Sequence, residues 1–448
     1  MHARNYVTMA LVMALLLPTF VAPFAVAYTP GDEAAVFGHT FAEEYWTNDS
    51  LFVEGDDGGN ASLTASYVGV GEFSAFLIAF NKITTNEGIE ITIPYQLFGM
   101  HYKTPSNQEV FVGAIFAFLL AHNETFGNND LPDVGNDPSW YVVPVSADNN
   151  PWGIESSVEP MQTTKLGDNH YRFGMKYNNL TARIVAGNTA GAFWLSLALP
   201  ILTVLISELE IVYDIYIDET GQVHAETLYT FGQVERAIWL LAIEQPAREI
   251  MVPSLKISAV HYVSIFTSRY RVVRSSTGNT LASPTGTDLL DDNLTIQVGD
   301  NNERAFDIGL GREYTLYNES TDPWTNLGTY NAINFLLEAQ ISDFFLIAWQ
   351  APLSVFIFAH MAYALSEQLH NTFANVQALV NNAGTAFANT QLWYGVTFPE
   401  WNGTRIVQDP VYVAYTNLSG APEGGGLGFL LIVGLVGVIA VVILRRRR

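Results

Sequence analysis

The segment ELEIVYDIYIDETGQVHAETLYTF, residues 208–231, carries the clearest fold signal in the chain. Its first half alternates between apolar and polar residues, so one face of an extended chain would carry Leu209, Ile211, Tyr213, Ile215 and Ile217. Because successive side chains of a strand point to opposite faces, this period of two predicts a half-buried β-strand. Residues 219–222 suit a tight turn, and a second alternating stretch runs from Val223 to Phe231. The segment therefore predicts an antiparallel hairpin with one buried face.

The other face of this hairpin is rich in ionisable residues. It collects Glu208, Glu210, Asp214, Asp218, His224 and Glu226. One interpretation is a cation site or a pair of catalytic carboxylates, since glycosidases place two carboxylates at set separations. The other is the solvated face of an antiparallel sheet, which commonly exposes one side to water. We expect the solvated acidic face.

Alternation of this kind, or enrichment in β-branched and aromatic residues, recurs along the chain and predicts further strands. They lie at 63–70, 73–80, 89–97, 140–145, 170–184, 254–273, 294–298, 305–310, 314–317, 392–398, 405–407 and 411–415. Between two of them, residues 275–292 are rich in Ser, Thr, Gly and Asp and predict a loop. Antiparallel sheets are therefore expected in both halves of the chain.

Three largely apolar segments predict helices instead, namely Val110–His122, Thr189–Ser207 and Ile333–Leu365, the last with a charge-free centre at Phe344–Ala359. The first is too short to cross a bilayer. If the second and third both crossed, residues 208–332 would be cytoplasmic, yet they contain no basic residue before Arg236. That arrangement opposes the positive-inside rule. We therefore expect buried helices packed against antiparallel sheets, and an α+β fold class.

The N-terminus carries an export signal. Residues 1–27 combine a short basic region, a long apolar run and the small-residue end Ala25-Val26-Ala27, which is the layout of a cleaved secretory signal peptide. The remainder would divide into an N-terminal β-rich lobe, residues 28–187, and a C-terminal α+β lobe, residues 188–419.

The C-terminus predicts a membrane anchor. A Gly-rich stalk at 420–426 leads into residues 427–444, which have no charged side chain, and four arginines follow at 445–448. At ~1.5 Å per helical residue the uncharged run reaches about 27 Å, close to the thickness of the hydrocarbon core. Basic residues beside a span stay in the cytoplasm. The sequence therefore predicts a single-pass protein of the cell membrane with an extracellular ectodomain.

These ends resemble archaeal secreted surface proteins with a C-terminal sorting signal of Gly-rich motif, span and arginine cluster. The resemblance implies that an archaeosortase-type membrane enzyme recognises the tail and exchanges the span for a lipid anchor. Proteins of that group usually carry Pro-Gly-Phe in the motif, whereas this chain has Leu427-Gly428-Phe429. The ectodomain resembles only uncharacterised archaeal secreted proteins, so the resemblance implies no activity.

Composition agrees with an extracellular location. The chain has 44 Asp and Glu against 20 Lys and Arg, a net charge of −24, and no cysteine. Such a charge repels nucleic acid and favours cations or basic partners, including other envelope proteins. Eight N-x-Ser/Thr sequons predict a glycoprotein. They begin at Asn48, Asn60, Asn123, Asn179, Asn293, Asn318, Asn402 and Asn417.

No cofactor, metal or catalytic residue is assigned by the sequence. The loop 128–138 holds Asn and Asp oxygens of the kind that calcium takes, but without the spacing of a calcium loop, and we expect a solvated loop. The chain contains no G-x-S-x-G, H-E-x-x-H, P-loop or G-x-G-x-x-G motif. A binding or envelope-structural role is the leading hypothesis. The alternatives are an extracellular hydrolase with dispersed carboxylates and a protein that handles lipids or other hydrophobic ligands, which the apolar segments suggest.

Overall fold

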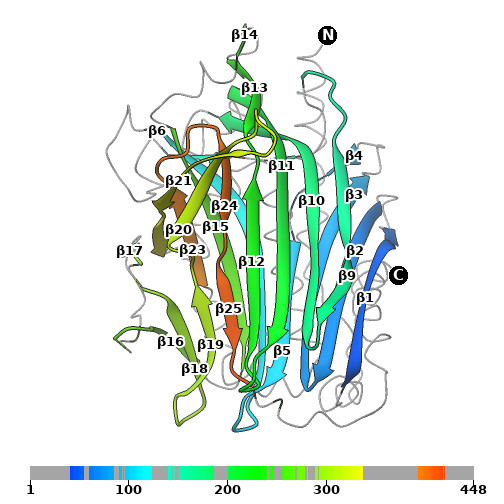
Figure 1. Ribbon diagram of the computed structural model, residues 1–448, viewed down its shortest axis with the longest axis vertical. Coiled ribbons are helices and arrows are strands. Elements are labelled where there is room, and N and C mark those ends of the chain that lie inside the picture. The colour runs from blue at the N-terminus through cyan, green and yellow to red at the C-terminus, as the bar shows by residue number, and fades with distance from the viewer. Residues whose placement is uncertain are drawn as a thin grey trace, which may run out of the picture.

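In the part of the chain that the computed structural model describes, the fold is all β (Figure 1). The structure describes residues 41–54, 60–84, 90–92, 94, 96–123, 140–143, 145–146, 151–185, 200–239, 243–246, 255–267, 270–277, 280, 288–290, 292–336, 392–416 and 418. Within these residues all regular secondary structure is β-strand, and neighbouring strands always pair antiparallel. The predicted α+β class is therefore wrong.

Eleven strands form the first sheet, called sheet A, in the order β1-β2-β3-β5-β6-β15-β23-β22-β17, with β4 beside β3 and β7 beside β6. They are β1 (Phe41–Glu54), β2 (Asn60–Gly71), β3 (Phe73–Thr84), β4 (Glu90–Ile91), β5 (Gln96–Lys103), β6 (Glu109–Asn123), β7 (Trp140–Val143), β15 (Leu255–Phe266), β17 (Asp288–Leu289), β22 (Ile333–Leu336) and β23 (Leu392–Phe398).

Fourteen strands form sheet B, whose main path is β14-β13-β11-β12-β25-β19-β18-β16. Strand β10 lies beside β8, β9 and β11, while β24 joins β12 to the hairpin β20–β21. The strands are β8 (Val145–Ser146), β9 (Ser157–Gly167), β10 (His170–Val185), β11 (Pro200–Ile217), β12 (Val223–Phe231), β13 (Val234–Trp239), β14 (Ile243–Pro246), β16 (Tyr270–Arg274), β18 (Leu294–Val298), β19 (Glu303–Gly309), β20 (Glu313–Asn318), β21 (Thr325–Asn331), β24 (Arg405–Gln408) and β25 (Val411–Ala414).

The hairpin predicted from residues 208–231 is confirmed as β11–β12. Its register runs from Leu209 opposite Phe231 to Ile217 opposite Val223. Gly221 takes a positive φ of 83° in the turn, a conformation that costs glycine little. The predicted inner face is buried, with Ile211 fully enclosed. Both strands lie at the centre of sheet B (Figure 1).

The predicted helices are strands wherever the structure describes them. Residues 110–122 belong to β6, residues 200–207 to β11 and residues 333–336 to β22, while 189–199 and 337–365 lie outside the described residues. In β6 the consecutive residues Val112, Gly113 and Ala114 are all buried. A strand buried on both faces has no polar face, so its sequence is continuously apolar and resembles a buried helix. Because β6 lacks a period-two pattern, the sequence wrongly predicted a helix there.

Sheets A and B pack face to face through aromatic side chains. Phe98 of β5 stacks on Tyr213 of β11 with ring centroids 4.3 Å apart. The hydroxyl of Tyr102 donates a hydrogen bond of 2.6 Å to the carbonyl of Ala305 in the other sheet. Burying each large apolar side chain contributes about 1.5–3 kcal/mol, and a stacked pair adds about 1 kcal/mol. One continuous core therefore joins the two sheets.

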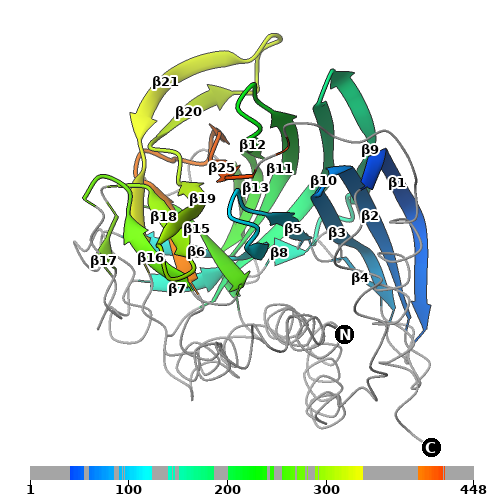
Figure 2. The same ribbon diagram turned by 90° about the horizontal axis from the view of Figure 1, so that it is seen from below.

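Along one side the sheets meet through side chains rather than through a β-ladder. The hydroxyl of Thr47 in β1 accepts a hydrogen bond of 2.8 Å from the backbone nitrogen of Thr163 in β9, and Thr163 donates its own hydroxyl to the carbonyl of Trp46. Figure 2 shows β1 and β9 lying side by side at this seam. Both sheets contain strands from before and after residue 188, because β6 pairs with β15 and β10 pairs with β11.

The predicted signal peptide, stalk, anchor, basic tail and acidic loop 128–138 lie outside the described residues. Among the residues that are described, no helix has the length and apolarity needed to cross a membrane. The predicted loop 275–292 is described only in part, and Asp288–Leu289 within it forms β17.

Candidate functional site

The six ionisable residues predicted on the outer face of the hairpin do lie on that face, but they are not a bare acidic surface. Five of them contact a hydrogen-bond or ion-pair partner, the exception being Glu210, and Glu208 is buried. The set divides into a lower group near the hairpin turn, around Asp218, and an upper group near the other end of the hairpin, around Glu208. Between the two groups lie two apolar residues, Val212 and Leu228, which are paired across β11 and β12. The predicted solvated acidic face is therefore present in part, because Glu226 is exposed whereas Glu208 is buried.

The lower group is centred on Asp218 at the hairpin turn. One carboxylate oxygen accepts hydrogen bonds from the backbone nitrogens of Thr220 and Gln222, at 2.8 and 3.0 Å, and the other lies 2.9 Å from Nε2 of His224. Burial opposes the charged form, but the hydrogen bonds from Thr220, His224 and Gln222 outweigh it and lower the pKa of Asp218 to about 2. This carboxylate stabilises the turn and is not a free ligand.

Neighbouring carboxylates on the same face are also engaged. Arg172 of β10 makes a bidentate contact with the carboxylate of Asp214, in which Nε donates at 2.7 Å to one oxygen and a terminal nitrogen donates at 2.5 Å to the other. Glu226 accepts a hydrogen bond of 3.0 Å from the hydroxyl of Tyr216, whose ring stacks on His224. Cross-strand pairs of this type stabilise a sheet by up to about 1 kcal/mol each.

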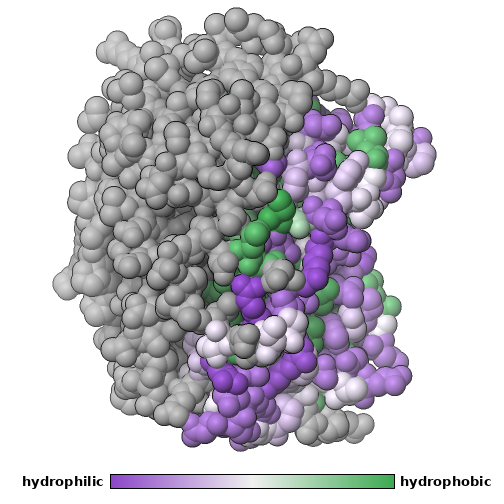
Figure 3. Space-filling model, turned by 90° about the vertical axis from the view of Figure 1, so that its left-hand side faces the viewer, coloured by the Kyte–Doolittle hydropathy of each residue, from purple (hydrophilic) through white to green (hydrophobic). Residues whose placement is uncertain are grey.

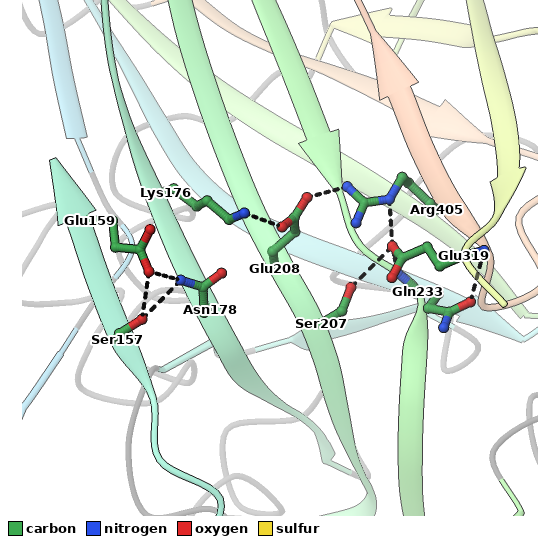
Figure 4. Close-up of polar contacts among 9 residues, drawn as sticks. All are labelled: Ser157, Glu159, Lys176, Asn178, Ser207, Glu208, Gln233, Glu319 and Arg405. Carbon is green, nitrogen blue, oxygen red and sulfur yellow. Dashed lines mark hydrogen bonds and ion pairs between the residues drawn. The ribbon is translucent and has the colours of Figure 1, made fainter. Parts of the chain in front are cut away.

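The upper group is organised around a buried arginine that sequence reasoning did not single out. Arg405 begins β24, and only 3% of its side chain is exposed. Its terminal nitrogen donates to Glu208 of β11, and its Nε lies 2.5 Å from a carboxylate oxygen of Glu319, at the end of β20. Figure 4 shows the guanidinium between these two carboxylates. A buried cation thus has an anion on two sides.

The same carboxylates bind further partners. Lys176 of β10 places its Nζ 2.8 Å from the second oxygen of Glu208. Glu319 accepts hydrogen bonds from the hydroxyl of Ser207 at 3.2 Å and from the backbone nitrogen of Gln233 at 3.1 Å (Figure 4). We call these six residues, Lys176, Ser207, Glu208, Gln233, Glu319 and Arg405, the Arg405 cluster.

A glycine allows this cluster to close. Gly232 follows β12, and its backbone nitrogen donates a 2.8 Å hydrogen bond to the carbonyl of Glu208. A Cβ at this position would lie 2.6 Å from the backbone nitrogen of Glu208, which is closer than real Cβ contacts allow. The close approach holds Gln233 beside Glu319, so any larger residue at 232 would push the cluster apart.

An aromatic side chain covers the cluster from outside. The Cζ of Arg405 lies 3.7 Å from the centre of the Trp324 ring, a cation–π contact. Trp324 precedes β21, and 47% of it is exposed. Tyr317 of β20 flanks it with ring centroids 6.3 Å apart. The hairpin β20–β21 therefore presents a large aromatic side chain to the surroundings, backed by a buried positive charge.

Burial and nearby charges shift the pKa values of one carboxylate in the cluster, Glu208, and of two beside it, Glu210 and Glu235. Burial alone would raise the pKa of Glu208, but Lys176 and Arg405 outweigh it and lower that pKa. Next to it, burial and the charge of Glu208 raise the pKa of Glu210. In the same way, burial and Glu319 raise the pKa of Glu235. Both oxygens of Glu208 are taken by cations, so it is poorly placed to act as a base or nucleophile.

The described residues contain no group of three or more His, Asp or Glu side chains arranged to hold a metal ion. The acidic loop 128–138 and residues 337–391 are not among them. The arrangement that is present suits binding, because it fixes an exposed indole in one orientation. No family model, no curated protein and no solved structure matches this chain.

Sequence reasoning missed Arg405, Glu319 and Trp324 because the cluster assembles through distant pairings. Arg405 and Glu208 are 197 positions apart, and Arg405 contacts Glu319 only because β24 pairs with both β12 and β20. The available signal was an arginine opening a predicted strand in a chain with few basic residues. Without the strand order, that signal had no partner.

Proposed function

We propose that this chain is a membrane-anchored extracellular surface glycoprotein with a binding role, and that it binds through the outer face of sheet B. The observation that carries the binding role is Trp324, which is about half exposed and rests on a buried arginine. Exposed tryptophans are costly in water and enriched at recognition sites, where they supply much of the binding energy. Rigid support lowers the entropy lost on binding.

The hydropathy of the described surface and the net charge are compatible with recognition in water. Figure 3 shows that the described part of the side bearing β16 and β17 is mostly hydrophilic, with hydrophobic residues confined to small areas. The net charge of −24 keeps such a surface soluble and separates copies of the chain. The extracellular location and the anchor rest on the sequence of the two termini.

The hydrolase and lipid-handling alternatives receive less support. In the Arg405 cluster the carboxylates are held by cations and hydroxyl groups. Between the sheets, Phe98 stacks on Tyr213, and the hydroxyls of Tyr394 and Tyr412 lie 2.5 Å apart across the two sheets. Aromatic side chains therefore fill the described interior at these positions, where a hydrophobic ligand would need space.

Two experiments test the proposal. Deleting residues 424–448 should release the protein into the medium, and a truncated protein that still sediments with membranes contradicts the anchor. For the binding role, the full-length protein in detergent is mixed with isolated cell envelopes of the producing organism and sedimented. Trp324→Ala should bind envelopes at least tenfold more weakly, whereas Tyr45→Ala, which removes another exposed aromatic, should bind normally. Equal binding by both variants contradicts the assignment of the face.

A further inference from the structure

We infer that the free face of Trp324 binds a neutral sugar ring, and that the ligand is a neutral polysaccharide of the envelope or its surroundings. This inference rests on the proposed binding function and names the class of ligand. It follows from the geometry of one indole ring, from the charges around it and from the polar side chains beside it.

Only one face of the Trp324 ring is available. Arg405 occupies the other face at 3.7 Å, and its guanidinium is held in turn by Glu208 and Glu319. Because Arg405 is itself buried, the indole cannot turn over without uncovering a buried ion pair. The free face is therefore presented in a fixed orientation, as a preorganised flat apolar surface.

Charge selects against ionic ligands. A cation attracted to the free face would compete for the same π electrons that already face Arg405, so a second cation gains little there. Anions are repelled at long range by a chain of net charge −24. A flat, uncharged ligand meets neither penalty.

Exposed polar residues of the hairpin that carries Trp324 supply hydrogen-bonding groups for such a ligand. Ser320, Thr325 and Asn326 are exposed on the same hairpin. The hydroxyls of Thr321 and Thr325 share a 2.7 Å hydrogen bond, and the side-chain oxygen of Asn326 accepts the backbone nitrogen of Gly328 at 2.8 Å. A few polar groups held in place near an apolar surface fix the orientation of a bound ligand. A sugar ring matches it, with a C–H face for the indole and hydroxyls at its edge.

A single aromatic ring on an open surface binds one sugar weakly. A polymer that repeats the ring compensates, since many anchored copies of the protein engage one chain and the effective concentration is high. The inference therefore names a polysaccharide and not a free monosaccharide. The competing partner for an exposed tryptophan is another protein, and the test separates the two.

The first test uses native gel electrophoresis of the full-length protein in detergent, through gels containing hydroxyethylcellulose, glucomannan, dextran or galactomannan. At least one neutral polymer should retard the wild type. Trp324→Ala should lose the retardation, with at least a tenfold weaker Kd, and Trp324→Phe should keep part of it. Leu327→Ala, which removes an exposed aliphatic side chain of the same hairpin, should match the wild type. The inference is overturned by absence of retardation in all four gels, by equal retardation of Trp324→Ala, or by stronger retardation in carboxymethylcellulose.

The second test needs no chosen polymer. Isolated envelopes are treated with periodate, which cleaves sugar diols, or with protease, before sedimentation with the protein. Periodate should abolish the Trp324-dependent binding and protease should leave it. The reverse result assigns the face to a protein partner and overturns the sugar inference, while the proposed binding function stands. Loss of any Trp324 dependence on untreated envelopes would instead contradict the proposed function itself.

Discussion

The guanidinium carbon of Arg405 lies 3.7 Å from the centre of the Trp324 ring, while the nitrogens of the same group face Glu208 and Glu319. The buried guanidinium is thus neutralised by one carboxylate of β11 and by another just after β20, and it is covered by the indole that precedes β21. This relationship connects the stability of the sheet to the orientation of an exposed tryptophan.

Removing the guanidinium should destabilise the protein much more than removing the indole. Arg405→Ala leaves Glu319 without its cation and Glu208 with Lys176 alone, and breaking a buried pair in this way costs about 3–5 kcal/mol. Trp324→Ala loses a partly exposed cation–π contact, worth about 0.5–2 kcal/mol. Urea unfolding measures both free energies. If Arg405→Ala lost less than Trp324→Ala, the cluster would not be the structural support of this face.

A buried histidine should make the protein sensitive to mild acid. His261 of β15 stacks on Tyr394 with ring centroids 5.0 Å apart, and burial lowers its pKa to about 3. The unfolded chain binds a proton near pH 6.5, whereas the folded protein does not until about pH 3. Stability should therefore fall as the pH falls through this window, by about 1.4 kcal/mol per pH unit from this group.

The variant His261→Phe isolates that contribution. It keeps an aromatic ring beside Tyr394 and removes the titrating group, so it should resemble the wild type near pH 7.5 and be the more stable of the two at pH 4.5. Unfolding curves at the two pH values give the difference. An unchanged difference between the two proteins at both pH values would show that His261 does not titrate between them.

The structure also ranks two of the sequons. Asn402 is exposed on a loop. Asn179, in contrast, has a φ of 56°, and its Nδ2 donates a 2.6 Å hydrogen bond to the carbonyl of Glu155. Glycan transfer uses this same nitrogen, so we expect occupancy at Asn402 and little at Asn179. Glycopeptide mass spectrometry of protein from its native host measures both, with Asn402→Gln as the control. Higher occupancy at Asn179 would contradict the ranking.

Local sequence patterns predicted most strands but not the fold class. The alternation in residues 208–231 gave the β11–β12 hairpin and its buried face, and residues 294–298 and 392–398 were predicted as strands with the observed bounds. Strand β6 was misassigned because it is buried on both faces and therefore loses the period-two signal. Whether a segment forms a strand can be read largely from its own residues. Whether both faces of that strand are buried depends on segments that are distant in the sequence.

The candidate site was the least predictable part for the same reason. The acidic residues of the hairpin were identified, but their partners Arg172, Lys176 and Arg405 come from strands whose pairing a single sequence does not reveal. The carboxylates therefore looked like a free acidic face. In the folded protein the distinctive feature is Trp324, which has no special spacing in the sequence.

The central claim is that the outer face of sheet B meets the extracellular medium on a protein held at the cell surface. Because the chain has no cysteine, single cysteines report exposure without background. Leu228 on this face is 40% exposed, and its neighbour Thr227 is fully buried. A membrane-impermeant maleimide added to intact cells should label Leu228→Cys and leave Thr227→Cys unlabelled. Labelling of Leu228→Cys only after lysis, or equal labelling of both variants, would contradict the account.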